Sequence, residues 1–175
     1  MQYDPRRSTT PPSPIEPTGF LTGIQIRPII GGIIVDTIAT FAMFNLYYWF
    51  FVAKELAGQD DAAEEALSQY LSSSEGLMAS LLLGSLGTVI GGFYAAYKAG
   101  TLEMKHGALV GIGSIVLGLF MQAAGLLGES PEWFMALSFA AAIPAGALGG
   151  FLAEMFKNAI GGAGSRASGG WRPPR

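Results

Sequence analysis

Residues 76–97 read GLMASLLLGSLGTVIGGFYAAY, a stretch of 22 residues without Asp, Glu, Lys or Arg. A helix needs about 20 apolar residues to cross the hydrocarbon core of a bilayer. Two further charge-free stretches occupy residues 107–128 and 133–153, and residues 28–53 carry a single charge, that of Asp36. The sequence therefore predicts four membrane spans and excludes a soluble globular protein.

The composition of the whole chain agrees with that conclusion. Half of its 175 residues are hydrophobic and 13% are charged, whereas charged residues make up about a quarter of a soluble chain. The absence of Cys excludes disulfides, thiolate metal sites and a cysteine nucleophile. With a single His and scattered acids, a His-rich metal site within one chain is not expected. We expect no cofactor, no metal and no nucleic-acid partner.

The predicted fold class is an all-α integral membrane protein, built as a four-transmembrane-helix bundle. Its transmembrane domain covers residues 27–157, with spans at about 28–53, 76–98, 106–128 and 132–156. Residues 1–26 are Pro-rich and polar, which is typical of a disordered tail. Residues 158–175 are rich in Gly and Arg and are expected to form a flexible tail.

The basic residues predict the orientation in the membrane. With four spans, nine of the ten Lys and Arg fall on one face and only Lys54 falls on the other. The positive-inside rule then places both termini in the cytoplasm. The basic tails would also attract anionic lipid headgroups at that face. The opposite face is acidic, with Glu55, Asp60, Asp61, Glu64, Glu65, Glu75, Glu129 and Glu132.

The acidic outer loop, residues 54–75, contains the pattern of a short helix. Asp60 and Asp61 are placed to cap it. One apolar stripe follows at spacings of three or four residues, made of Ala63, Ala66, Leu67, Tyr70 and Leu71. Such a helix would lie on the outer membrane surface or cover the bundle. The alternative is a solvated acidic loop.

The spans are rich in glycine, which would weaken a helix in water. Three GxxxG pairs stand out, formed by Gly87 and Gly91, Gly107 and Gly111, and Gly146 and Gly150. Small residues at this spacing allow close backbone approach between helices in lipid. Two interpretations remain open: the faces pack the four helices together, or at least one of them receives a partner helix.

Asp36 is an acidic residue inside the first span. It lies nine residues in from Arg27, Ser114 lies nine in from Lys105, and Thr88 lies ten in from Lys98. At 1.5 Å per residue, all three lie about 14 Å from the cytoplasmic boundary. Thr40, one turn along from Asp36, can join them. This polar layer could fix helix register, handle protons or cations, or contact another subunit.

Two other features bear on function. Glu103 and His106 stand three residues apart in the second loop, a pairing that is sometimes catalytic, although a solvated, capped turn is the simpler interpretation. The stretch GGFYA at residues 91–95 is echoed by GGFLA at residues 149–153. Either the two halves form a tandem helical-hairpin repeat, or glycine-rich spans resemble each other by composition.

The segment GGFYAAYKAGTLEMKHGALVG, residues 91–111, resembles the central hairpin of uncharacterised small bacterial four-transmembrane-helix proteins. Their pattern is Gly-Gly-aromatic-x-Ala, a short charged turn, then His-Gly-x-x-x-Gly. The residues that carry the match are Gly91, Gly92, Ala95, Glu103, His106, Gly107 and Gly111. The resemblance implies a helical bundle in a bacterial inner membrane and no particular activity.

These patterns favour a non-enzymatic accessory or scaffold subunit that packs against other integral membrane proteins, or against itself, through its small-residue faces. The alternative is a small homo-oligomeric transporter or channel that handles protons or cations at Asp36. We expect no catalysis, because the sequence shows no Ser/His/Asp set, phosphate-binding loop or HExxH motif.

Overall fold

The structure is a computed structural model that describes residues 22–53, 63–126 and 130–167. Its elements are α1 (Ile26–Tyr47), the π-helical turn η1 (Tyr48–Val52), α3 (Ala63–Ser72), α4 (Ser74–Ala99), α5 (Glu103–Ala123) and α6 (Glu132–Ala167). Within these described ranges, four stretches are long and apolar enough to cross a membrane: Ile26–Val52, Ser74–Ala99, Glu103–Ala123 and Glu132–Ile160. The predicted all-α, four-helix membrane bundle is confirmed.

Local sequence explains where α4 begins and ends. The side chain of Ser73 accepts a hydrogen bond of 3.1 Å from the backbone N–H of Gly76, which caps the first turn. Gly100 ends the helix in the left-handed conformation, with φ of 74°, which glycine adopts without a Cβ clash. Leu102 also has a positive φ, of 51°. The chain can therefore reverse within three residues and begin α5 at Glu103.

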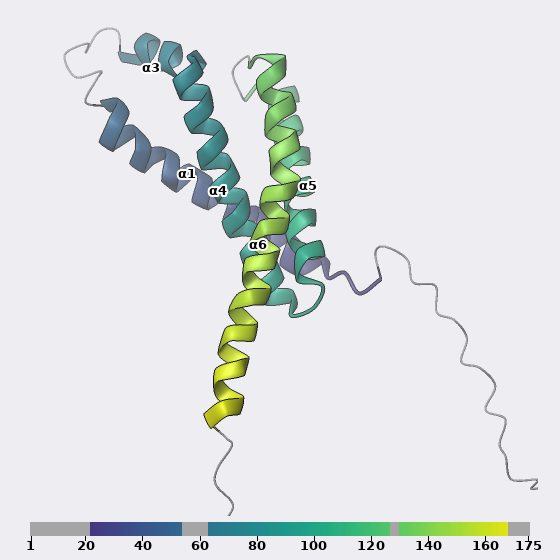
Figure 1. Cartoon of the computed structure of the whole chain (residues 1–175). Coiled ribbons are helices and arrows are strands. Elements are labelled where there is room, and N and C mark those ends of the chain that lie inside the picture. The colour runs from purple at the N-terminus through teal and green to yellow at the C-terminus, as the bar shows by residue number, and fades with distance from the viewer. Residues whose placement is uncertain (1–21, 54–62, 127–129, 168–175) are drawn as a thin grey trace, which may run out of the picture.

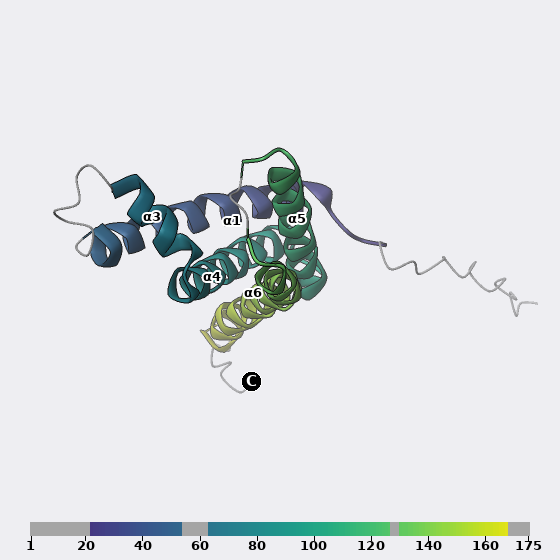
Figure 2. The ribbon, with the colours of Figure 1, turned by 90° about the horizontal axis from the view of Figure 1, so that it is seen from above.

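The four spanning helices run alternately up and down, and α4 packs against α1, α5 and α6. They converge where α4 turns into α5, which we call the turn end, and diverge toward the opposite or open end (Figure 1). Toward the open end, α1 leans away from α5 and α6. Seen from above, α4 lies between α1 and α6 (Figure 2). The bundle is thus tight in one half and splayed in the other.

Backbone contact between glycines holds the tight half together. A Cβ on Gly92 would lie 2.5 Å from the carbonyl oxygen of Gly146, and one on Gly107 would lie 2.2 Å from the same oxygen. Distances below 3.0 Å are essentially never seen for real Cβ atoms. Small or β-branched side chains fill the space that remains, and Ala95, Ala96, Val110 and Ala153 are completely buried.

The helix bounds differ from the predicted spans, most of all in α5 and α6. α5 begins at Glu103 and ends at Ala123, where Gly125 turns the chain with φ of 69°. α6 continues to Ala167, so residues 158–167, expected in a flexible tail, are helical. The first helix begins at Ile26 rather than 28. Hydropathy marks where lipid begins, whereas a helix satisfies its own backbone hydrogen bonds and can continue into water.

The short helix expected in the acidic loop is present as α3, which packs on α4. The hydroxyls of Tyr70 in α3 and Tyr47 in α1 are hydrogen-bonded to each other. This bond fixes α3 beside the end of α1. The predicted cap at Asp60 and Asp61 and the tails at residues 1–21 and 168–175 lie outside the described residues.

Candidate functional site

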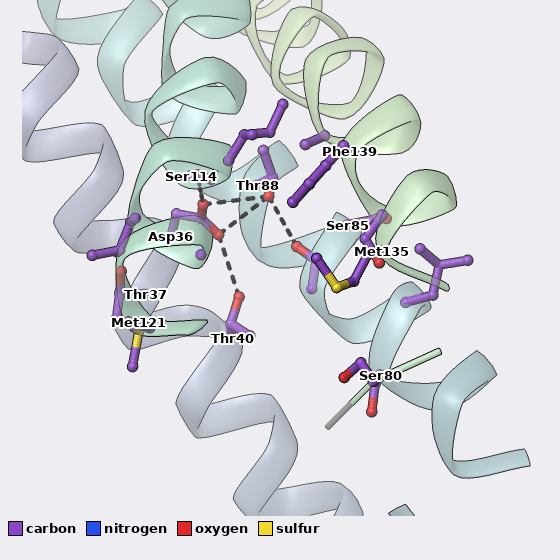
Figure 3. Close-up of a pocket in the computed structure, with 18 of the residues that line it drawn as sticks. Asp36, Thr37, Thr40, Ser80, Ser85, Thr88, Ser114, Met121, Met135 and Phe139 are labelled. Atoms are coloured by element: carbon purple, nitrogen blue, oxygen red, sulfur yellow. Dashed lines mark hydrogen bonds between the residues drawn. The ribbon is translucent and has the colours of Figure 1, made fainter. Parts of the chain in front are cut away.

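The structure brings together all four side chains of the predicted polar layer (Figure 3). Thr88 Oγ1 lies 3.3 and 3.4 Å from the two carboxyl oxygens of Asp36. Thr40 Oγ1 lies 3.3 Å from Asp36 Oδ1, and Ser114 Oγ is hydrogen-bonded to Asp36 Oδ2. Helices α1, α4 and α5 thus each supply at least one group to a cluster around one carboxyl.

Glycines on α4 make this cluster sterically possible. A Cβ on Gly91 would lie 2.5 Å from the carbonyl oxygen of Gly32 and 2.7 Å from the Cβ of Asp36. A Cβ on Gly87 would lie 1.8 Å from Thr40 Oγ1. The Gly87 and Gly91 face is therefore the surface on which the polar part of α1 rests. Asp36 is 6% exposed and Thr88 is 5% exposed.

Two of the hydroxyls have a second acceptor. Thr88 Oγ1 lies 3.0 Å from the carbonyl oxygen of Gly84, and Ser114 Oγ lies 3.0 Å from that of Val110. A hydroxyl carries one proton, so each can donate either to its own helix or to Asp36. When both donate to their helices, one of them can accept the single hydrogen bond that a protonated Asp36 donates. The cluster can therefore accommodate the ionised and the neutral carboxyl on one heavy-atom framework.

The cluster lies at the end of a cavity in the splayed half of the bundle. The cavity has a volume of about 500 Å³ and is lined by all four spanning helices. Its walls come from residues 36–44 of α1, 80–88 of α4, 114–122 of α5 and 134–142 of α6, together with Ser130. Asp36, Thr88, Ser114 and Ala142 mark its inner end, where the tight half of the bundle begins.

Among the described residues that line this cavity, Asp36 is the single one with an acidic or basic side chain. The remaining lining is aromatic, aliphatic, methionine, hydroxyl or amide in character. No group of three or more His, Cys, Asp or Glu is arranged to hold a metal ion within the part of the chain that the structure describes. The chemistry that the site offers is thus one carboxyl, a ring of hydroxyls and an apolar enclosure.

The six glycines of the GxxxG pairs all pack within the chain itself. Gly87 and Gly91 meet α1, whereas Gly107 and Gly111 meet α6. The backbone of α5 in turn covers Gly146 and Gly150, with Gly107 and Glu103 as the nearest neighbours. The GGFYA and GGFLA echoes also lie side by side, since a Cβ on Gly149 would meet the backbone at Val89 and Phe93.

His106 has a structural environment that the sequence interpretation missed. It is completely buried, so the expectation of a solvated turn is wrong for this residue. Its Nε2 accepts a hydrogen bond of 3.0 Å from the backbone N–H of Gln25, and its Nδ1 lies 3.1 Å from the carbonyl oxygen of Leu102. The Gln25 side chain donates to the carbonyl oxygen of Ala99. The residues just before α1 are thereby attached to the α4–α5 turn.

Glu103 pairs with Lys157 of α6. Lys157 Nζ lies 3.1 Å from Glu103 Oε1 and 3.0 Å from the carbonyl oxygen of Ala96, near the end of α4. It also lies 5.7 Å from the centre of the Tyr97 ring. One lysine therefore connects three helices at the turn end. The sequence offered a signal, because Lys157 follows the last span at the depth where lysines of membrane helices reach the interface.

Comparisons of this chain with protein-family models, with curated proteins and with solved structures found no match.

Proposed function

We propose that this protein is a small transporter of the bacterial inner membrane that binds a proton or another cation at Asp36. The observation that carries the proposal is the position of this carboxyl. It lies at the inner end of a cavity of about 500 Å³, and hydroxyls from three helices surround it. An ionisable residue inside a membrane costs about 2.5–3.5 kcal/mol on insertion scales, and such residues usually mark ion pathways.

The hydroxyls give this carboxyl the property that a carrier site requires. A carrier site must be stable both with and without its bound ion, since the carrier returns empty or reloaded after each cycle. Thr88 and Ser114 can donate to the charged carboxylate, or they can donate to Gly84 and Val110 when the carboxyl is neutral. Their rotation exchanges one set of hydrogen bonds for another, which lowers the cost of changing the charge state.

The shape of the bundle favours a transporter over an open channel. The cavity ends at the Asp36 cluster, and beyond it the helices meet backbone to backbone at Gly92, Gly107 and Gly146. Such contacts leave no room for water between these helices. Passage across the membrane would therefore need a change in how the helices pack, which is the basis of alternating access.

The charged residues support an orientation in which both termini are cytoplasmic. The described basic residues of the spans, Arg27, Lys98, Lys105 and Lys157, all belong to the turn end of the bundle. The positive-inside rule assigns that end to the cytoplasm. The cavity would then open toward the outside, and the basic end would face anionic lipid headgroups.

The accessory-subunit function and the homo-oligomeric state stay predictions. The six glycines that motivated the accessory role pack against helices of the same chain. This arrangement supports a self-contained bundle, and it removes the main reason for expecting other membrane proteins at those faces. A transporter therefore fits the geometry better than a scaffold.

The test is cation flux in liposomes that contain the purified full chain. A potassium gradient with valinomycin sets the membrane potential, and a trapped dye reports internal pH. A parallel series omits valinomycin, imposes a sodium or potassium gradient and follows that cation with a trapped dye selective for it. We expect the wild type to conduct at least one of these cations, and Asp36→Asn to lower that flux by about tenfold or more.

Glu154→Gln is the matched control, since Glu154 is an exposed acid of α6 outside the cavity. Equal flux in the wild type, Asp36→Asn and empty liposomes would refute the proposal. If Asp36→Asn does not fold, the wild type can be treated with a hydrophobic carbodiimide, which modifies protonated carboxyls in membranes. Modification of Asp36, located by peptide mass, must then block the flux, and unchanged flux would also refute the proposal.

A further inference from the structure

We infer that the cavity above Asp36 binds an amphipathic organic cation, whose charged group lies at the carboxyl and whose apolar body fills the space between the helices. The inference rests on the proposed function and names the substrate class of the same site. Four features support it: the size of the cavity, its aromatic walls, the charge of Asp36, and the second hydrogen-bond acceptors of the Thr88 and Ser114 hydroxyls.

The size of the cavity exceeds what an inorganic cation requires. Sites for small organic molecules usually enclose about 300–1,000 Å³ and have mainly apolar walls with a few placed polar groups. The volume here, about 500 Å³, falls within that range. Inorganic cations prefer shells of six or more oxygens, whereas most of this lining is apolar. The size and the lining of the cavity therefore match an organic molecule.

Aromatic rings line the cavity from two helices, α1 and α6. Phe41 and Phe44 line the cavity from α1, and Phe134 and Phe139 line it from α6. Met121 and Met135 add polarisable thioethers (Figure 3). Aromatic faces attract organic cations by about 0.5–2 kcal/mol each, and most strongly where water is excluded. Methionine adapts to apolar shapes of different outline.

The isolated charge determines the sign of the ligand. Asp36 is the single acidic or basic residue in the described lining of the cavity, and the groups facing it are Thr40 of α1, Thr88 of α4 and Ser114 of α5. An ionised carboxyl in an apolar enclosure is costly without a counter-charge. A lipid chain or another neutral molecule could lie only beside the protonated carboxyl, and an anion would be repelled by the ionised one. A cation is the ligand that pairs with the ionised carboxyl.

The second acceptors of the two hydroxyls allow the ligand and a proton to exchange at Asp36. In the empty site Asp36 is protonated, and Thr88 and Ser114 donate to Gly84 and Val110. When the cation enters, the carboxyl O–H bond breaks and its proton leaves to water. The carboxylate then pairs with the cation while the hydroxyls turn to donate to it. Reprotonation reverses these steps and releases the cation.

The experiment measures binding of tetraphenylphosphonium to the purified full chain in detergent by titration calorimetry. Repeating the titration in two buffers with different ionisation enthalpies reports the protons released. We expect saturable binding with release of a proton in the wild type. Asp36→Asn should weaken the affinity by about tenfold or more, which corresponds to 1.4 kcal/mol, and should abolish the proton release.

A pair of phenylalanine variants tests the aromatic walls. Phe139→Ala removes a ring that lines the cavity, whereas Phe120→Ala removes a ring of α5 that is 68% exposed and lies outside it. We expect weaker binding by about fivefold for the first, in line with the loss of one ring. We expect no change for the second. Equal effects of the two substitutions would contradict a role for the walls.

The outcomes distinguish this inference from the proposed function. If flux through liposomes depends on Asp36 but tetraphenylphosphonium does not bind, the organic-cation inference is wrong and the transporter proposal stands. Binding that is equal in the wild type and Asp36→Asn, without proton release, would show that the probe only partitions into an apolar space, and it would overturn the inference. If an Asp36→Asn preparation is unfolded, proton release by the wild type still decides, since an apolar space alone releases none.

Discussion

The backbone N–H of Gln25 donates a hydrogen bond of 3.0 Å to Nε2 of His106, across 81 residues of sequence. Because Nε2 accepts this bond, the ring proton lies on Nδ1 and points to the carbonyl oxygen of Leu102. The imidazole thus joins the start of α1 to the first turn of α5. It therefore ties the helix that carries Asp36 to the helix that carries Ser114.

Replacing His106 by Ala should loosen this connection. The N–H of Gln25 and the carbonyl of Leu102 would both lose a partner, which we expect to lower the free energy of unfolding by about 1–3 kcal/mol. Amide hydrogen exchange at Gln25 should accelerate. Met104→Ala, at an exposed position of the same helix turn, is the control. Unchanged protection of the Gln25 amide in His106→Ala would contradict the structural role.

Glycines of α4 should differ sharply in their tolerance of a methyl group. Gly91→Ala places a Cβ 2.5 Å from the carbonyl oxygen of Gly32, a contact that only a backbone shift can relieve. We expect Gly91→Ala to lower the free energy of unfolding by about 1–3 kcal/mol. Gly84→Ala meets nothing within 4 Å and should leave stability unchanged or slightly raised. Thermal unfolding in detergent can compare the two, and similar midpoints would show that the α1–α4 contact is looser than described.

The Lys157–Glu103 pair should contribute a modest coupling. Both side chains are partly exposed, at 27% and 16%, so water screens the attraction. We expect about 0.5–1 kcal/mol from a double-mutant cycle of Lys157→Met and Glu103→Gln. Lys157→Met alone should cost more than Glu103→Gln alone, because Lys157 also donates to the carbonyl of Ala96. The reverse order would mean that this backbone contact carries little energy.

The absence of cysteine makes the orientation easy to test. Thr101 is exposed in the α4–α5 turn, and Ser72 is exposed at the end of α3. Each can be replaced by Cys as a single labelling site. If the turn end is cytoplasmic, a membrane-impermeant maleimide added to intact cells should label Ser72→Cys and spare Thr101→Cys. Both should react after the cells are opened. The opposite labelling pattern would show that the protein has the inverse of the proposed topology.

The four spans could be predicted from the sequence because a charge-free stretch of about 20 residues is a local property. That property alone decides whether a helix can cross the hydrocarbon core of a bilayer. Depth arithmetic also placed Asp36, Thr88 and Ser114 at one level, since helix rise is constant and lysine or arginine marks the boundary. The structure brings these side chains within hydrogen-bonding range. Both inferences needed only distances along single helices.

The cavity and the His106 and Lys157 contacts could not be predicted in this way. Each depends on how helices rotate and cross, which follows from the glycines that face one another rather than from any one span. Gly92 and Gly146 lie far apart in sequence, yet their contact determines how closely α4 and α6 approach. The same contact leaves the other half of those helices free to diverge around the cavity.

The glycine contacts of the tight half have a further consequence for how the gene can vary. Every missense change of a glycine codon adds at least a Cβ, and at Gly92, Gly107, Gly111 and Gly146 that atom would lie within 2.5 Å of a backbone oxygen on a neighbouring helix. No substitution at these positions is therefore conservative. Around the cavity, where space is already open, side chains can change size at little cost. Mutational drift should therefore alter what the cavity accepts long before it alters the frame that encloses it.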